Sequence, residues 1–506
     1  MFEFYPEPVL FVGGAGCKSC AHLREQNALL RASNAQLRAE LAAARLSVQQ
    51  GRAQLEALQG RIAALSKNSQ TSSKPPSSDI VKAERRSRKA KRKRGAQPGH
   101  RRHERAPFAP EELTAPPFEH YAPAVCPHCG GAGVPDPDWT PKVMQYVELE
   151  QVPLKKEEHR YHACRCLDCQ QLYSAEASAP MQAAGLCGPR LTAPIGYLKS
   201  ALHASFSTIR RFLRDVVGLP LSRGYLCKLI GKVSRSLQDP YEELIAALVH
   251  QPALQVDETG HKDNGKRFWT WVFRAELYVL FKIADNRSSQ VLIDLLGTEF
   301  NGVLGCDFFS AYRKYMREFD VRVQFCLAHL IREIRFLCEL PPGIGCSYGQ
   351  KLLKPIREMF ALIARGQERG LDRHQMSADL DLARKRILRV ADQQAPAPGA
   401  GGPGAKAAWN LAQRLRRYGE AYFQFITTPE IQPTNNLAEQ AIRFVVIDRL
   451  VTQGTRSLKG RQFCERLWTV LATCTAQKRP VLDYLIKAVE AYFHNQPAPS
   501  LMPAGP

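Results

Sequence analysis

The sequence predicts a multidomain protein in which a coiled coil, a cysteine-knuckle module and a helix-turn-helix segment precede an α/β domain that a helical insertion interrupts. Three observations lead to this prediction: a heptad pattern near the N-terminus, paired cysteines, and strand-like runs that alternate with helical runs after residue 250. A length of 506 residues also implies several domains at roughly 100 to 200 residues each. The expected boundaries are 20–66 for the coiled coil, 67–105 for a basic linker, 106–180 for the cysteine module, 186–240 for the helix-turn-helix segment, 250–340 and 431–490 for the two parts of the α/β domain, and 341–430 for the insertion.

A heptad pattern runs through residues 23–65. One of its two series consists mostly of leucine, and the other begins with Asn27 and Asn34. Six heptads predict a coiled coil, and a buried pair of asparagines favours a parallel two-stranded register. We therefore expect a homodimer or a higher oligomer. One long helix that folds back on its own chain is the alternative, because Gly51 and Gly60 weaken the helix.

Basic residues are concentrated after the coiled coil. The chain has a formal charge of +22, and residues 71–105 hold 13 Lys and Arg against 3 Asp and Glu. The run Lys82–Arg94 lacks apolar periodicity and follows a segment rich in Ser and Pro. Such a run predicts an unfolded, self-repelling arm whose natural partner is a polyanion. A solvated charge run without a partner is the alternative.

Composition also limits the compartment. No stretch reaches the roughly 18 uncharged apolar residues that span a bilayer, so we expect no membrane association. The opening MFEFYPEPVLF lacks the basic start of a secretory signal, and an odd count of 15 cysteines favours a reducing compartment. The sequence therefore predicts a cytoplasmic protein. An early CKSC pair, Cys17 and Cys20, has no second half nearby and is left unassigned.

Two C-x-x-C knuckles predict a zinc-binding module, or zinc finger. The first, CPHC, contains Cys126 and Cys129, and the second, CRCLDC, contains Cys166 and Cys169. A strand-like segment, MQYVELEQVPL, separates them. Four thiolates on two such turns provide the tetrahedral site that Zn²⁺ prefers. Cys164 could replace Cys166, and packing cysteines without metal are the alternative to zinc.

Residues 186–236 read as short helices interrupted at Gly218-Leu219-Pro220. Ser222 is expected to cap the helix that follows. That helix should bury one apolar face and leave one basic face outward; the apolar residues are Leu226, Leu229 and Ile230, and the basic ones Arg223, Lys228 and Lys232. A helix, a tight turn and a basic helix are typical of a helix-turn-helix. A helical hairpin with no DNA contact is the alternative.

From residue 250 the pattern becomes α/β. The strand-like runs are ALQV, RFWTWVF, YVLFKIA, GVLGCDFF and VRVQFC. Short turns link the first three, which predicts an antiparallel meander before helical crossovers begin. Residues 341–430 are polar and helical and contain the low-complexity run QQAPAPGAGGPGAK, so they look inserted.

Carboxylates at the ends of apolar runs predict an acidic site. Asp257 ends ALQV and Asp307 ends VLGC, and charges at such positions are costly unless they are paired or hold a cation. Glu258 should face away from Asp257, because neighbouring strand residues point to opposite faces. The third acid is expected at Glu439, on a helix whose inward residues would be Leu437, Ala441 and Ile442.

Glu439 and Asp307 could each cap a helix instead of binding a metal ion. Glu439 follows Asn436 by three residues, which is the spacing of a capping box. Asp307 could cap a helix that begins at Phe308.

The segments QVDETG, VLGCDFFSAYRKY, FCLAHLIRE and PTNNLAEQAIR together closely resemble the IS66 family of insertion-sequence transposases. The resemblance extends to SKNSQTSSKPPSSD, GAQPGH and the cysteine knuckles, and so covers nearly the whole chain. It implies an RNase H-like catalytic domain with a DDE triad of Asp257, Asp307 and Glu439. Such a triad holds two Mg²⁺ (or Mn²⁺) ions for phosphodiester cleavage and strand transfer. A helical insertion between the second and third acids also fits the family.

The same resemblance implies further roles. His329 is similar to a family histidine near the scissile phosphate, although a histidine bonded to backbone at a helix start is equally expected. The resemblance implies that the polyanionic partner is DNA, in the form of terminal inverted repeats and target DNA. It also implies small accessory proteins and a bacterial, nucleoid-associated location. The expected DNA-binding residues are Arg92, Lys93, Arg94, Arg223, Lys228, Arg332, Arg443 and Arg449.

Two other functions compete with transposition. A zinc-containing, dimeric DNA-binding regulator would carry the same fold with an inactive acidic domain. A metal-dependent structure-specific nuclease would cleave DNA without joining it.

Overall fold

The computed structural model describes residues 18–65, 109–112, 154–157, 163–165, 172–174 and 177–502. The chain divides into two compact units, one of residues 1–83, 177–210 and 221–506, the other of residues 84–176 and 211–220. Several predicted sites lie outside the described residues: the arm Lys82–Arg94, which includes Arg92 and Lys93, and the cysteines Cys126, Cys129, Cys166 and Cys169. No helix in the described ranges has the length and apolarity needed to cross a bilayer.

The heptad segment forms one continuous helix, α1, from Lys18 to Leu65. Gly51 does not interrupt it, and Leu23 and Leu30 are 54% and 61% exposed. Helices in water are stabilised mainly by burial of their apolar face, so a single helix with a row of exposed leucines gains little stability from packing. The predicted helix is thus confirmed, and its pairing with a second helix stays a prediction.

Two short strands flank the second cysteine pair in the sequence. They are β1 (Ala163–Arg165) and β2 (Leu172–Ser174), and they pair antiparallel with Cys164 opposite Tyr173. A 3-10 turn, η2, covers Pro110–Glu112. The zinc ligands themselves stay a prediction.

Short helices follow, as the sequence predicts. Ser222 accepts a hydrogen bond from the backbone N–H of Tyr225 (3.2 Å) and so caps α5, as expected. Gly218, with φ +74°, ends the π-helical turn before it. The elements are α2 (Ala179–Ala184), α3 (Pro189–Ser200), α4 (Phe206–Phe212), the π-helical η3 (Leu213–Val217), α5 (Arg223–Ser236), α6 (Gln238–Ala247) and η4 (Leu248–His250).

The two faces of α5 agree with the prediction except at one lysine. The expected apolar residues Leu226, Leu229 and Ile230 are buried, and Arg223 and Lys228 are exposed. The expectation that Lys232 points outward is wrong. Its Nζ donates to the carbonyl of Ala184 (2.8 Å), because the C-terminal end of α2 offers unpaired carbonyl oxygens to a nearby cation.

Five strands form one mixed sheet in the order β5-β4-β3-β6-β7. The first three in the sequence form the predicted antiparallel meander, whereas β6 runs parallel to β3 and β7 parallel to β6. The segment between β3 and β6 contains β4, β5 and one helix, and one helix joins β6 to β7, so each parallel pair has the long connection that it requires. The strands are β3 (Ala253–Asp263), β4 (Lys266–Arg274), β5 (Val279–Ala284), β6 (Val303–Cys306) and β7 (Arg322–Phe325).

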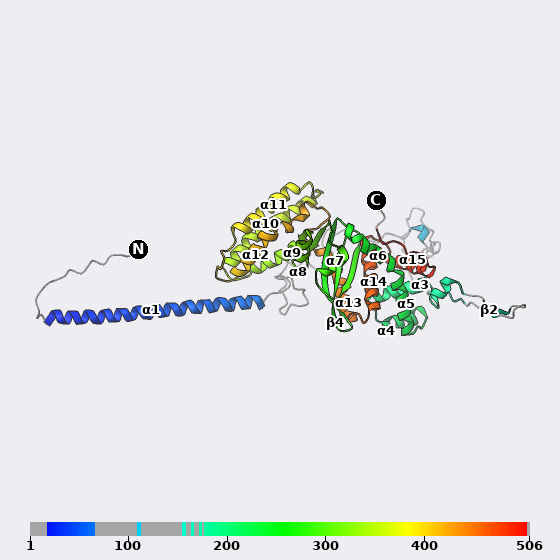
Figure 1. The fold of residues 1–506 in the computed structure, drawn as a ribbon, viewed down its shortest axis with the longest axis horizontal. Coiled ribbons are helices and arrows are strands. Elements are labelled where there is room, and N and C mark those ends of the chain that lie inside the picture. Colours follow the sequence, from blue (N-terminus) through cyan, green and yellow to red (C-terminus); the bar gives the residue numbers. More distant parts are fainter. Residues whose placement is uncertain are drawn as a thin grey trace, which may run out of the picture. The chain divides into compact units, whose positions relative to one another are not determined.

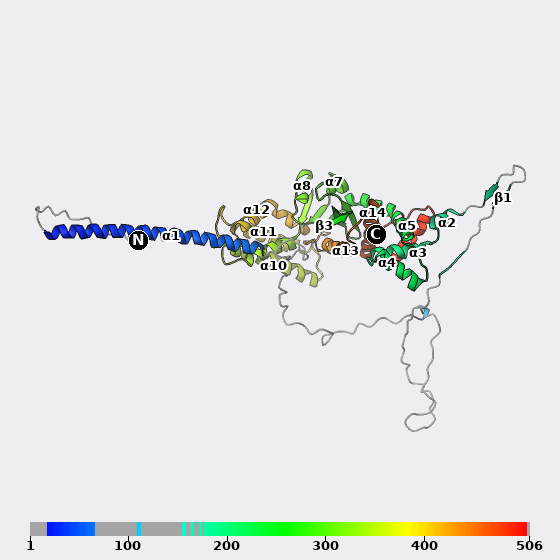
Figure 2. The same cartoon turned by 90° about the horizontal axis from the view of Figure 1, so that it is seen from below.

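Helices cover both faces of this sheet (Figures 1 and 2). On one face α13 packs on β3 and β4, and α14 packs on β5. Ala438, Ile442 and Val445 of α13 join the core there. The prediction that Leu437 points inward is wrong, because Leu437 is 38% exposed and the neighbouring Ala438 is buried in its place. These helices are α7 (Gln290–Leu296), α8 (Ser310–Phe319), α9 (Leu327–Cys338), α13 (Asn436–Thr452) and α14 (Leu458–Ala476), whereas α15 (Val481–Phe493) packs on α2, α3, α5 and α14.

The predicted insertion is helical. Its three long helices pack on one another and stand together in Figure 1. They are α10 (Ile344–Glu368), α11 (Ser377–Gln393) and α12 (Ala405–Tyr418), followed by the 3-10 turns η5 (Gly419–Tyr422) and η6 (Gln424–Ile426).

Helix α9 and the insertion together form a loop whose two ends are adjacent. At the start of α9, the backbone N–H of Leu327 donates to the carbonyl of Pro433 (3.0 Å). Arg373, in the turn between α10 and α11, donates to the carbonyl of Pro429 (3.0 Å) and to Oε1 of Gln432 (2.6 Å). The insertion therefore holds the segment that leads into α13.

The edge strand β5 is closed by side chains instead of a further strand. Residues of α14 spaced four apart accept backbone N–H groups of β5: Glu465 from Ile283 (2.7 Å), Thr469 from Phe281 (3.0 Å) and Thr473 from Val279 (3.1 Å). Because α14 covers this edge, these N–H groups would otherwise be buried without partners. One helix face thus replaces the missing neighbour strand.

Thr469→Val is expected to lower the free energy of unfolding by about 1 to 3 kcal/mol, since it keeps the shape of the side chain and leaves the N–H of Phe281 unpaired. Urea denaturation followed by tryptophan fluorescence measures this, because Trp468 is buried beside the site. Thr298→Val, at an exposed position, is the matched control. Equal stability of the two variants would contradict the edge-closing role.

Candidate active site

Asp257 lies in the middle of β3. The expectation that the strand ends at this residue is wrong, because β3 continues to Asp263 as a hairpin with β4. Oδ1 of Asp257 accepts a hydrogen bond from the backbone N–H of Glu258 (2.9 Å).

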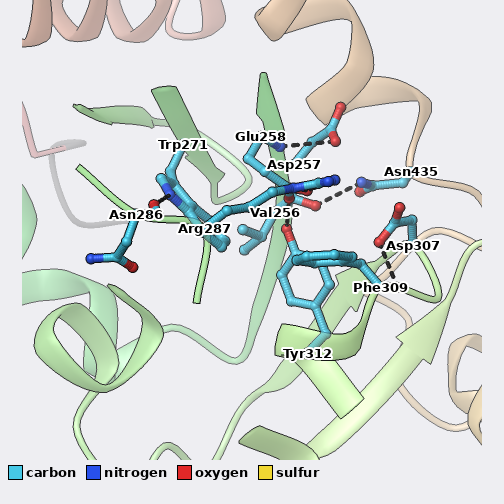
Figure 3. Close-up of polar contacts among 10 residues, drawn as sticks. All are labelled: Val256, Asp257, Glu258, Trp271, Asn286, Arg287, Asp307, Phe309, Tyr312 and Asn435. Carbon is cyan, nitrogen blue, oxygen red and sulfur yellow. Dashed lines mark hydrogen bonds and ion pairs between the residues drawn. The ribbon is translucent and has the colours of Figure 1, made fainter. Parts of the chain in front are cut away.

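Glu258 faces the opposite side of the sheet, as predicted (Figure 3). Its carboxylate is almost fully buried and accepts hydrogen bonds from Arg287 (Nε, 2.8 Å) and from the hydroxyl of Tyr312 on α8. The guanidinium of Arg287 also lies over the ring of Phe309, 3.8 Å from its centroid. Glu258 is therefore fully used in a structural network.

Asp307 directly follows β6, as predicted. The parallel register pairs Gln255 with Gly305, and continuing it by two residues brings Asp307 beside Asp257. Neighbouring strands are about 4.8 Å apart, so the two carboxylates lie near each other where β6 ends. Oδ1 of Asp307 accepts the backbone N–H of Phe309 (2.9 Å), which closes a turn before α8 rather than capping a helix at Phe308.

Glu439 comes from α13, the helix that covers β3. The helix begins at Asn436 with Asn435 as its N-cap, which makes Glu439 the fourth helical residue and one position beyond a capping box. Its carboxylate instead lies 3.9 Å from Nδ1 of His329 and 3.6 Å from Nη2 of Arg332.

Burial and nearby acids raise the pKa of both aspartates. Burial raises the pKa of Asp257 far above its ordinary value, and the charges of Glu258, Asp307 and Glu439 raise it further. Burial, followed by the charge of Glu258, raises the pKa of Asp307 to about 7, and Glu439 adds to this rise. Three mutually repelling carboxylates fit a divalent cation, whose charge would relieve the repulsion.

Three buried polar atoms at this site have no hydrogen-bond partner among the described residues. They are Oδ1 of Asn435, Oε1 of Glu439 and Nδ1 of His329. Burial lowers the pKa of His329 to about 4, so its imidazole is neutral at pH 7. Nδ1 of His329 makes no hydrogen bond to the backbone of a described residue. Orphaned buried acceptors are what a bound cation or its waters would satisfy.

Two residues of this site were not among the predicted ones. Nδ2 of Asn435 donates to the carbonyl of Val256 (2.7 Å), and its backbone N–H donates to Sγ of Cys326 (3.2 Å). Cys326 is 3% exposed at the start of α9. The only sequence signals were their positions, three and four residues before the two predicted residues His329 and Glu439.

The predicted basic residues have different surroundings. Arg332 lies against Glu439, whereas Arg443 is exposed one turn further along α13. Arg449 donates to the carbonyl of Gly260 on β3, which commits its guanidinium to the protein.

Comparison with known families agrees with this architecture. Residues 184–462 match the family described as Transposase IS66 family, which is more than half of the chain. The chain belongs to the IS66 transposase family. This membership gives transposition as its function and DNA as its partner. Residues 21–106 match a second family, described as a family of unknown function (DUF6444), and no curated protein matches the sequence.

Asp307→Asn tests the electrostatics of this IS66 family site. A pKa raised from 3.8 to about 7 means that the folded protein holds a proton that the unfolded chain releases, so its contribution to stability is lost as pH rises through this range. Without added metal, Asp307→Asn should therefore become more stable relative to the wild type between about pH 4 and pH 7. Thermal unfolding at several pH values measures this. A difference that is constant with pH would contradict the raised pKa.

Proposed function

We propose that this chain is a DDE transposase that cuts and joins insertion-sequence ends by two-metal phosphodiester hydrolysis and strand transfer. The observation that carries the proposal is the convergence of Asp257, Asp307 and Glu439, which come from β3, the end of β6 and α13; the charge of Glu439 helps to raise the pKa of both aspartates. The strand order β5-β4-β3-β6-β7, with β4 antiparallel to β3, supports an RNase H-like domain.

The three acids act together in this proposal. Asp257 on the central strand would hold two Mg²⁺ (or Mn²⁺) ions together with Asp307 and Glu439. When bound, such ions activate the attacking water or DNA 3′-hydroxyl and stabilise the leaving oxygen. His329, neutral at pH 7, can donate a hydrogen bond to the scissile phosphate without adding charge.

Several elements are proposed to bind DNA. Arg332 and Arg443 offer planar guanidinium groups beside Glu439, and Arg223 and Lys228 are exposed on α5 of the proposed helix-turn-helix. The basic arm supplies further phosphate contacts.

Two more modules complete the proposed assembly. The exposed leucine seam of α1 supports a coiled-coil homodimer or a higher oligomer. The zinc-binding module would use Cys126, Cys129, Cys166 and Cys169, and accessory proteins of the same element would assist.

Glu439→Gln should reduce cleavage and joining of a terminal-repeat substrate by about a thousandfold or more, because a neutral amide is a poor ligand for a divalent ion. Folding and end binding should persist. Strand-cleavage and strand-transfer assays measure the first, and electrophoretic mobility shift the second.

Glu430→Gln, at an exposed glutamate just before α13, is the matched control and should cleave normally. Near-normal cleavage by Glu439→Gln would refute the triad. A wild-type chain that binds the repeats without ever cleaving them would favour the inactive regulator.

Removal of the basic arm should weaken the salt dependence of DNA binding. Each phosphate contact contributes a slope of about −0.9 to a plot of log affinity against log salt concentration. Replacement of Lys82–Arg94 by a neutral Gly/Ser segment of equal length should flatten that slope by several such contributions. An unchanged slope in fluorescence anisotropy titrations would identify the arm as a solvated charge run.

A further inference from the structure

Cys326, His329 and Glu439 form a compact cluster at one side of the acidic site. Cys326 is the N-cap of α9, His329 lies in its first turn, and Glu439 reaches across from α13. One potential ligand atom from each residue lies within 4.8 Å of the other two. Across a tetrahedral zinc ion, sulfur, nitrogen and oxygen ligands are about 3.4 to 3.6 Å apart. A contraction of at most about 1.4 Å between any two of these atoms would therefore let the three share one ion.

The donors of this cluster differ from those of the two aspartates. Asp257 and Asp307 offer only oxygen, which suits Mg²⁺, whereas the cluster offers a sulfur, an imidazole nitrogen and a carboxylate oxygen. Nδ1 of His329 and Oε1 of Glu439 are buried and bonded to no described group. Mixed sulfur and nitrogen donors favour a borderline-soft ion such as Zn²⁺.

We propose that Cys326, His329 and Glu439 form a zinc site that competes with the catalytic Mg²⁺ site for the carboxylate of Glu439. Zinc binding there displaces the thiol proton of Cys326 to solvent and leaves a fourth coordination position open to water. Glu439 cannot serve both ions at once, so Zn²⁺ should inhibit DNA cleavage. The binding step stands on the cluster alone, and its inhibitory consequence rests on the proposed transposase activity.

The first measurement is direct metal binding to the full-length chain, with Co²⁺ as a spectroscopic substitute for Zn²⁺. The wild type should show near-ultraviolet thiolate-to-cobalt absorption that is missing in Cys326→Ser. Cys474→Ser, at a fully buried cysteine outside the cluster, is the matched control and should keep the absorption. The comparison cancels cobalt bound at the proposed zinc-binding module, which all three proteins share.

His329→Gln provides a second variant in case serine at position 326 impairs folding. Loss of a nitrogen ligand should weaken Co²⁺ binding by about tenfold or more. Identical cobalt absorption and affinity in the wild type and in whichever variant folds would overturn the site.

The second measurement is cleavage at fixed Mg²⁺ with increasing Zn²⁺. The zinc concentration that halves the rate should rise about tenfold or more in Cys326→Ser, relative to its own zinc-free rate, but not in Cys474→Ser. Equal zinc sensitivity in all three proteins would overturn the competition. A wild-type chain that never cleaves in Mg²⁺ would instead refute the proposed function, and the cobalt result would still decide the site.

Discussion

Mutual repulsion among buried carboxylates is the constraint on which this architecture depends. Asp257 and Asp307 are brought together by the parallel register of β3 and β6, and Glu439 is added from a helix that follows the insertion. The pKa shifts record the electrostatic cost of this arrangement. The surrounding fold must therefore be rigid enough to hold the acids together. The closed edge of β5, the core beneath α13 and the Glu258–Arg287 pair on the opposite face all contribute to that rigidity.

The opposite face also moderates the charge. Arg287 pairs with Glu258 and lowers the pKa of Asp307, so one guanidinium offsets two of the four neighbouring acids. Its position between aromatic rings, with Trp269 and Phe309 within 4.7 Å and 3.8 Å of the guanidinium, fixes its orientation. Loss of this arginine would increase the repulsion among the carboxylates of the acidic site while leaving Asp257, Asp307 and Glu439 themselves unchanged.

Much of this site could be predicted from the sequence, because its strands are apolar runs and its acids follow or interrupt them. The meander and the position of Asp307 after β6 followed from local pattern alone. The second half of β3 did not, because its partners lie far along the chain, in α13 and just after it. The hydroxyl of Thr455, three residues beyond α13, hydrogen-bonds both His261 and Asp263. Lys232 and Leu437 were misjudged for a related reason: their surroundings depend on the ends and phases of other helices. Cys326 and Asn435 meet only in three dimensions, so no spacing rule could have paired them.

The hydrogen bond between Leu327 and Pro433 closes a loop that contains α9 and the insertion. A chain that returns to its point of departure can lengthen, shorten or change its sequence without moving the acids on either side, since the entropy of closing a loop grows only slowly with its length. The number of residues between Asp307 and Glu439 therefore says little about the geometry of the acidic site.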